Sequence, residues 1–248
     1  MAILDLTKIK SAKELEEAAR RDLEGKTLSE IAGWINESDS VSRITSKGNV
    51  GYVIEEGYFG IKKNSGKTFD IQSLGVELKT SPLKFLKNGT LTVKEPLSLN
   101  IINYTQEAKS KGIKESSLFK KNNKILFVWY IHHVSSMRSE YIIKYVFLWE
   151  MNAQVIKELT PDYNAIIKKI KDGKAHEIHQ SDHKYLTLCP KHGGVFRDPK
   201  DKKSKTKQPF SNAPAEIRAF RLKNSYMNMV ISRYLLAEKP NAINEFKK

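Results

Sequence analysis

Two runs of β-branched and aromatic residues, Lys124–Val134 and Tyr141–Met151, constrain the fold of this chain most strongly. Such residues are enriched in strands because their side chains pack well on a pleated surface. Both runs stay apolar over most of their length, which is typical of strands covered on both faces of a sheet. The sequence therefore predicts two buried central strands, with further strands at residues 69–80 and 97–104.

Helix signals surround these strands. A capping box, Ser11-x-x-Glu14, predicts the start of one helix, and Thr160-Pro161 predicts another with proline at its first position. A chain of 248 residues that is 40% hydrophobic can bury a sizeable core. We therefore expect a single α/β domain over residues 1–248. The predicted helices span residues 11–23, 160–171 and 225–236.

Two carboxylates and an ammonium group, Asp70…Glu77-x-Lys79, lie in the first predicted strand. Side chains alternate along a strand, so Glu77 and Lys79 share a face, with their side chains roughly 7 Å apart. Carboxylates are preferred ligands of Mg²⁺, which can polarise a phosphoryl oxygen and help to ionise water, while the lysine steadies the developing charge. The group suits metal-dependent cleavage of a phosphodiester. Its spacing alone also fits a solvated edge strand.

The charge balance favours a polyanionic partner. Lysine and arginine number 43 against 28 acidic residues, which gives a net charge of +15. Such an excess predicts salt-dependent binding to nucleic acid, although charge alone does not separate DNA from RNA or an anionic membrane. No run of 18 apolar residues and no signal-peptide pattern is found, so we expect no membrane association. The single cysteine, Cys189, fits a cytoplasmic protein without internal disulfides.

The segment 189–214 is strongly basic, with five lysines between residues 200 and 207. Like charges repel one another, so such a block stays loose until a polyanion neutralises it. We expect a mobile insertion that serves as a DNA-recognition loop; the alternative is a solvated disordered loop. Guanidinium groups can donate two hydrogen bonds to guanine, and lysines suit phosphates. The predicted base readers are Arg197, Arg218 and Arg221, and the predicted phosphate contacts are Lys202, Lys203, Lys205 and Lys207.

The order of these segments resembles the MutH family of mismatch-repair endonucleases, which nick unmethylated strands at GATC. The most specific part is the run 74–80 after Asp70, and the resemblance extends to residues 23–32, 47–60, 120–129 and 218–223. The chain also resembles the catalytic half of GATC-cutting type II restriction endonucleases of the same superfamily. The resemblance implies a restriction-endonuclease-like α/β fold, with a mixed central sheet flanked by helices, and Mg²⁺-dependent cleavage of double-stranded DNA.

Site residues follow from the resemblance by position. Asp70 and Glu77 would bind the metal, Lys79 would assist the water, and Glu55 would add a helical acidic ligand, unless a one-residue slip gives that position to Glu56. Arg221 stands where MutH has a tyrosine that senses methylated adenine, so methyl discrimination is not implied here. The remaining carried-over residues are Lys121 at the scissile phosphate and Lys47 and Lys223 on DNA.

We therefore predict a Mg²⁺-dependent, sequence-specific endonuclease that acts as a type II restriction enzyme at GATC-like sites. Two alternatives remain: a MutH-like nickase that works with a partner, and a basic DNA-binding module without catalysis. Because a palindromic duplex presents two equivalent phosphates, a homodimer on DNA is expected for cutting both strands.

Overall fold

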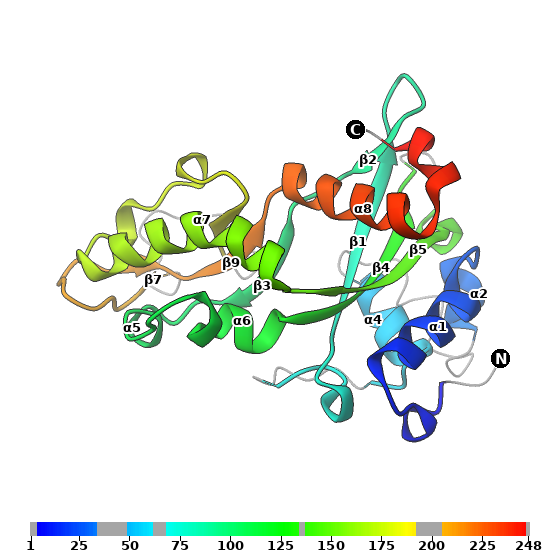
Figure 1. Ribbon diagram of the computed structural model, residues 1–248, viewed down its shortest axis with the longest axis horizontal. Helices are drawn as coiled ribbons and strands as arrows, with labels where there is room; N and C mark the ends of the chain where they lie inside the picture. The colour runs from blue at the N-terminus through cyan, green and yellow to red at the C-terminus, as the bar shows by residue number, and fades with distance from the viewer. Residues whose placement is uncertain (1–3, 34–48, 62–67, 134–136, 192–204, 247–248) are drawn as a thin grey trace. The chain divides into compact units, whose positions relative to one another are not determined.

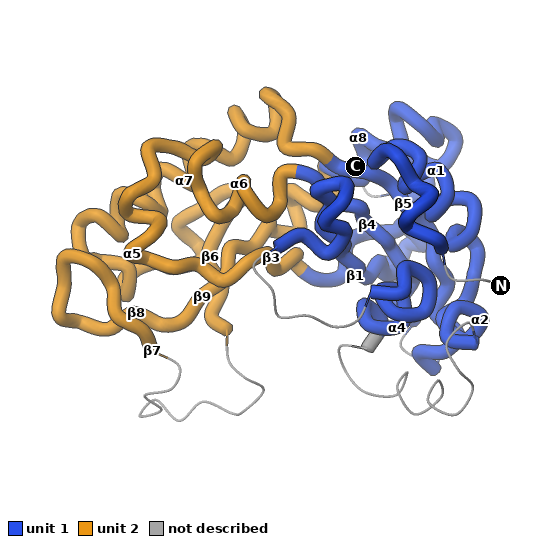
Figure 2. The backbone as a smooth tube through the Cα atoms, turned by 90° about the horizontal axis from the view of Figure 1, so that it is seen from below, with its two compact units in different colours: residues 1–95, 124–149, 230–248 blue, residues 96–123, 150–229 orange. Residues whose placement is uncertain are grey.

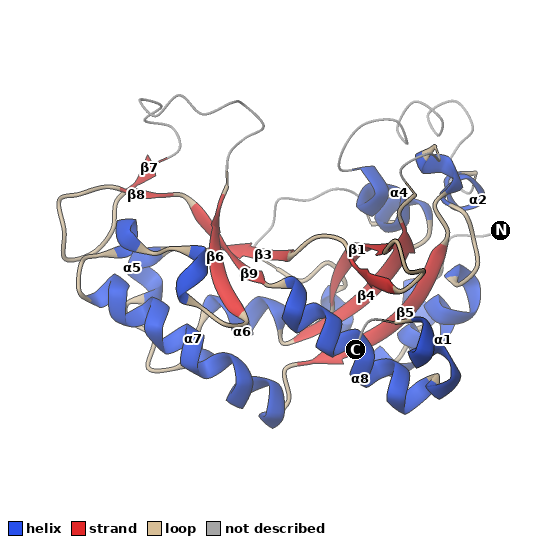
Figure 3. Ribbon diagram, turned by 90° about the horizontal axis from the view of Figure 1, so that it is seen from above, coloured by secondary structure: helices blue, strands red, loops and turns tan. Residues whose placement is uncertain are grey.

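The computed structural model describes residues 4–33, 49–61, 68–133, 137–191 and 205–246 (Figure 1). The backbone divides into two compact units (Figure 2). Unit 1 comprises residues 1–95, 124–149 and 230–248, and unit 2 comprises residues 96–123 and 150–229. Each unit contains its own sheet and helices, so the chain is α/β, as predicted (Figure 3). That residues 1–248 act as one domain stays a prediction.

Unit 1 is built on a four-stranded sheet with the order β2-β1-β4-β5. β1 runs parallel to β4 and antiparallel to β2, so the sheet is mixed. Both predicted central strands are confirmed, and residues 125–129 of β4 are completely buried. The predicted strand 69–80 is wrong over residues 69–76, where a turn replaces it, and correct from residue 77 onward. The strands are β1 (Glu77–Phe85), β2 (Leu91–Val93), β4 (Lys124–Ile131) and β5 (Ile143–Glu150).

Helices cover both faces of this sheet. Ser11 Oγ accepts a hydrogen bond from Glu14 N at 3.1 Å, which confirms the predicted helix start. α1, α2 and α4 pack apolar side chains against Leu78, Leu126 and Val128, and burying each such side chain contributes about 1.5–3 kcal/mol. On the other face Tyr234 of α8 stacks on Phe147, with ring centroids 4.1 Å apart. The helices are α1 (Ala12–Leu23), α2 (Leu28–Ala32), α4 (Asn49–Gly57) and α8 (Asn224–Glu238), whose first residues belong to unit 2.

Unit 2 contains a three-stranded antiparallel sheet in the order β3-β9-β6 and a separate two-stranded pair, β7-β8. The Tyr163 ring of α7 packs on Phe220 of β9 at 6.4 Å, so α7 covers one face of the larger sheet. The strands are β3 (Leu97–Ile101), β6 (Leu186–Pro190), β7 (Lys205–Thr206), β8 (Ala215–Glu216) and β9 (Arg218–Leu222); the helices are α5 (Tyr104–Glu107), α6 (Ser117–Asn122) and α7 (Ala153–Lys171).

Short 3₁₀ helices join these elements. No helix in the described ranges is both long enough and apolar enough to cross a membrane. The 3₁₀ helices are Leu6–Lys8, Gln72–Leu74, Ile113–Glu115, Arg138–Glu140, Ala175–Glu177, Gln180–Asp182 and Pro240–Glu245.

The predicted start of α7 at Thr160 is wrong. The helix begins at Ala153, where the side chain of Asn152 accepts a hydrogen bond from Val155 N at 3.1 Å, and Pro161 lies inside it. Proline removes one backbone donor, but the Thr160 hydroxyl donates to Ile156 O at 2.6 Å and supplies a local hydrogen bond. Apolar packing on both sides of the proline therefore keeps the helix continuous.

Asp162, 8% exposed, joins α7 to the start of β6. Its carboxylate accepts three backbone hydrogen bonds, from Lys184 N at 2.9 Å, Tyr185 N at 2.6 Å and Leu186 N at 2.8 Å. Removing it would leave three buried or half-buried donors without this acceptor.

We expect Asp162→Ala to lower the free energy of unfolding by roughly 3 kcal/mol or more, because hydrogen bonds to charged groups contribute about 1.5–3 kcal/mol each. Asp172→Ala, which removes a surface i,i+4 pair with Lys168, is the matched control and should cost less than about 1 kcal/mol. Urea denaturation measures both. Equal losses would show that the three amide contacts contribute little.

Candidate active site

A tight turn brings Asp70 beside the first residues of β1. Ile71 and Val76 pair through two backbone hydrogen bonds of 2.9 and 3.1 Å, and Gly75 closes the turn with φ of 61°. Glycine adopts this left-handed conformation without a steric penalty. Asp70 Oδ2 then accepts a hydrogen bond from Leu78 N at 2.9 Å. The turn thus holds the Asp70 carboxylate against the backbone between Glu77 and Lys79.

Glu77 and Lys79 form an ion pair at the start of β1. Glu77 is 2% exposed, and its Oε1 lies 2.5 Å from Lys79 Nζ, which also donates to Leu78 O at 3.2 Å. The lysine side chain is 23% exposed, so it is accessible to solvent. The alternation of strand side chains therefore places the two groups together, as the spacing indicates.

The setting of this pair argues against a solvated edge strand. At Glu77 and Lys79, β1 pairs with β4 on one side, and β2 joins its other side only from Leu83 onward, but Glu77 is nevertheless buried. Burying a carboxylate carries a desolvation penalty of several kcal/mol, which a structural surface strand has no need to bear. A buried acid beside a partly exposed lysine is better explained by chemistry at this point of the sheet than by a solvated strand.

Glu55 approaches β1 from α4. A Cβ placed on Gly51 would lie 3.6 Å from Glu55 Oε1 and 3.2 Å from Thr80 Oγ1. The Glu55 carboxylate therefore lies on the side of α4 that meets the strand. Among the described residues no three His, Cys, Asp or Glu side chains gather closely enough to hold a metal ion, so Glu55 does not complete a three-carboxylate cluster.

The donors at β1 nonetheless fit Mg²⁺. This cation takes oxygen ligands and is often bound through only one or two carboxylates, with water and substrate phosphate filling the other positions. Asp70 and Glu77 offer such oxygens. The hydrogen bond from Leu78 N holds the Asp70 carboxylate at the residue that follows Glu77.

Unit 2 contains the described members of the predicted DNA-binding set. Lys205 and Lys207 are exposed, and Arg221 and Lys121 are half-buried, in β9 and α6 respectively. Lys223 donates a hydrogen bond to the carbonyl oxygen of His183. Four predicted residues lie outside the described part of the chain: Lys47, Arg197, Lys202 and Lys203.

Arg218 has a different environment from the one expected of a base reader. It is 6% exposed; Nη1 donates to Ile178 O at 2.6 Å and to Ala175 O at 3.3 Å, while Nη2 lies 3.1 Å from the Glu216 carboxylate. In this arrangement the guanidinium stabilises unit 2, and contact with a base would require the network to open. The sequence pattern could not reveal these carbonyl partners because they lie about 40 residues away.

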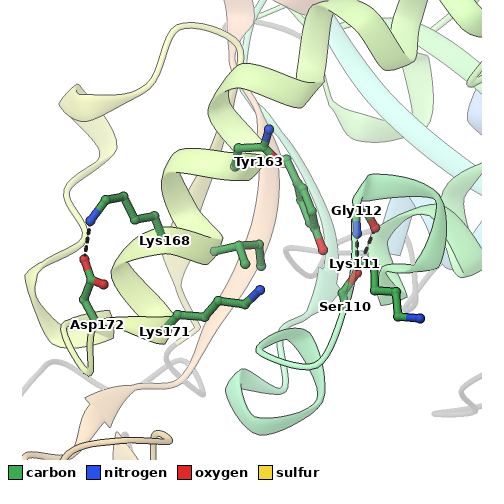
Figure 4. A pocket seen from close by; sticks show the side chains of 9 residues that line it. Ser110, Lys111, Gly112, Tyr163, Lys168, Lys171 and Asp172 are labelled. Carbon is green, nitrogen blue, oxygen red and sulfur yellow. Dashed lines mark hydrogen bonds and ion pairs between the residues drawn. The ribbon is translucent and has the colours of Figure 1, made fainter.

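A pocket of about 340 Å³ lies against α7 in unit 2 (Figure 4). Its lining includes Tyr163, Lys171 and the turn at Ser110, whose hydroxyl donates to Gly112 O at 2.8 Å. Lys168 pairs with Asp172 at 2.6 Å on the other side. None of the predicted site residues lines this pocket. The sequence does not single out its lysines, because lysine is frequent throughout a chain of net charge +15.

Comparison with known proteins finds relatives of this chain among DNA-acting enzymes. The family described as the DNA mismatch repair enzyme MutH matches residues 59–162. The type II restriction enzyme Sau3AI of Staphylococcus aureus is 36% identical over 217 residues, which are 87% of this chain and 41% of that enzyme. The DNA mismatch repair protein MutH of Actinobacillus pleuropneumoniae serotype 3 is 30% identical over 186 residues, 73% of this chain and 77% of that protein.

A second MutH, from Buchnera aphidicola, is 28% identical over 187 residues, covering 74% of this chain and 77% of its own length. The chain thus spans about three quarters of these two MutH proteins and about two fifths of the Staphylococcus enzyme.

Proposed function

The chain belongs to the MutH family, and on that premise we propose that it is a sequence-specific endonuclease that hydrolyses phosphodiester bonds of double-stranded DNA. The observation that carries this proposal is the arrangement at β1. Asp70 Oδ2 is held on Leu78 N, and the buried Glu77 is paired with the half-exposed Lys79. Similarity to a restriction enzyme and to mismatch repair proteins supports DNA as the substrate.

We propose that Asp70 and Glu77 hold Mg²⁺. When bound, the ion would polarise the phosphoryl oxygen and favour ionisation of the attacking water. Lys79 holds a positive charge 2.5 Å from Glu77 Oε1, where it can orient that water and stabilise negative charge that develops on the phosphate. Glu55, on the strand-facing side of α4, is the proposed additional acidic group, and Lys121 the proposed contact to the scissile phosphate.

GATC-like recognition rests on the family resemblance, as does the choice between cutting and nicking. Digestion of a plasmid that lacks adenine methylation, with Mg²⁺ or with a chelator, tests the proposal. We expect cleavage only with Mg²⁺, and sequencing of the product ends should place them at GATC. Ends scattered over many sequences would contradict sequence-specific cleavage, and intact plasmid under all conditions would contradict the endonuclease proposal itself.

A nicking endonuclease is the second candidate, favoured by the coverage of the MutH relatives. One Asp70–Glu77–Lys79 group hydrolyses one strand at a time, so cutting both strands of a palindrome calls for two chains related by a two-fold axis. If the chain pairs on DNA, the rate of linear product should rise faster than linearly with its concentration. Nicked circles as the final product at every concentration would favour the nickase.

A cytoplasmic location stays a prediction.

The lysines of the basic segment are proposed to contact phosphates. Neutralising Lys202, Lys203, Lys205 and Lys207 together should weaken binding to every DNA sequence and flatten the plot of log affinity against log salt. Each lost phosphate contact should lower its slope by about 0.9. Fluorescence anisotropy over a range of salt concentrations measures this. The matched control neutralises four exposed lysines of unit 1: Lys8, Lys13, Lys84 and Lys87. A quadruple variant with altered sequence preference and an unchanged slope would contradict the phosphate role.

A further inference from the structure

Phe210 combines two unusual properties. Its φ is 61°, and among the described residues it alone of the non-glycine residues has a positive φ. Bulky L-residues rarely adopt this conformation because their Cβ crowds the backbone. The residue is also 73% exposed, so its ring gains no burial that would offset the strain.

The loop that carries Phe210 is firmly held on both sides. β7 and β8 pair through Lys205 with Glu216 and Thr206 with Ala215, which closes the loop at its base. Inside it Gln208 is 6% exposed. Its side chain accepts a hydrogen bond from Ala175 N at 2.7 Å, donates to Ala213 O at 2.6 Å, and lies 2.8 Å from His176 Nδ1. The exposure of Phe210 is therefore not the result of a loosely held loop.

The backbone of Phe210 also rests on Gly173, just after α7. A Cβ added to Gly173 would lie 2.4 Å from Phe210 O, and Gly173 itself has φ of 70°. Only glycine fits such an approach. The packing thus fixes Phe210 in a strained conformation with its ring in solvent, and strain maintained by surrounding structure is characteristic of functional positions.

We propose that the ring of Phe210 packs against bases at an opened step of the DNA substrate; this inference rests on the proposed function. The exposed Lys205 and Lys207 on the same hairpin can hold the adjacent phosphates. DNA-binding proteins combine apolar wedges between base steps with basic side chains on the backbone in this way. The residues that follow in the loop, Ser211 and Asn212, are polar, and Ile101 is the other large hydrophobic residue that is exposed in the described part of unit 2, so the loop itself offers no run of exposed apolar side chains on which a protein could dock.

Phe210→Gly separates function from folding. Glycine adopts φ of 61° without strain, so the urea midpoint of this variant should hold or rise. DNA affinity, measured by anisotropy in a chelator so that no cleavage occurs, should fall by roughly tenfold, because a base–aromatic contact is lost. The salt slope should not change, since the ring carries no charge. Met137→Ala, which truncates another exposed apolar side chain, should bind like the wild type.

Base unstacking gives a direct second readout. Duplexes with 2-aminopurine at successive positions should show increased fluorescence at one step with the wild type and with Phe210→Trp, and none with Phe210→Gly. If the wild type binds and cuts DNA while Phe210→Gly keeps full affinity and the fluorescence increase, the Phe210 proposal alone is overturned. A changed salt slope in Phe210→Gly would overturn it too, since phosphate contacts would then explain the loss. A wild type that binds no DNA would overturn the proposed function along with it.

Discussion

Asp70→Asn and Glu77→Gln are each expected to reduce the rate of DNA cleavage by roughly a hundredfold or more, with DNA affinity unchanged or increased. Each substitution removes a negative charge from the proposed metal ligands while nearly keeping the shape of the side chain. Loss of one preorganised electrostatic contact at a reacting centre costs on the order of 10²–10³ in rate. Removing a carboxylate near phosphate relieves like-charge repulsion, so binding has no reason to weaken.

Single-turnover cleavage at saturating enzyme measures the first effect, and anisotropy in a chelator measures the second. Glu17→Gln, which alters an exposed acid of α1, is the matched control and should cleave like the wild type. Undiminished cleavage by Glu77→Gln would remove Glu77 from the site. Cleavage by the wild type would exclude the alternative of a DNA-binding module without catalysis. That alternative would be favoured if the wild type and the variants bind DNA equally and none of them cleaves it.

Lys79→Met is expected to inactivate the protein and also to destabilise it. It removes a positioned ammonium group and takes away the charge that lies 2.5 Å from the buried Glu77 carboxylate. Breaking a buried ion pair from one side costs about 3–5 kcal/mol, and because Lys79 is 23% exposed we expect the lower end of that range.

The double variant Glu77→Gln, Lys79→Met distinguishes the two effects. It removes both charges, so the free energy of unfolding should recover most of the loss while cleavage stays absent. Lys84→Met, on the exposed surface of the same strand, is the control for both measurements. Cleavage that returns together with stability would mean that neither charge is needed for the reaction and that Lys79→Met fails only through folding.

Local patterns predicted the elements that place the candidate site. The apolar runs gave β4 and β5, the capping box gave the start of α1, and strand alternation placed Glu77 and Lys79 on one face. Residues 71–75 can bend, but the sequence does not predict the form of the turn between Asp70 and β1. Its shape depends on one left-handed glycine and one backbone pair rather than on a repeating pattern.

The features that sequence reading missed depend on contacts distant in the chain. The carbonyl partners of Arg218 come from residues 175 and 178, and the contact that requires Gly173 comes from residue 210. Helix α7 runs through Pro161 because packing on both sides outweighs the loss of one hydrogen bond. Residue type and spacing carry no direct information about such partners.

Binding of Mn²⁺, a paramagnetic substitute for Mg²⁺, tests the central claim most directly. Electron paramagnetic resonance can count the ions bound per chain in complex with a cleavage-resistant duplex. We predict that binding seen in the wild type and in Glu17→Gln is lost in Asp70→Asn and in Glu77→Gln. Equal Mn²⁺ binding by all four proteins would contradict the assignment of Asp70 and Glu77 as the ligands of a catalytic metal.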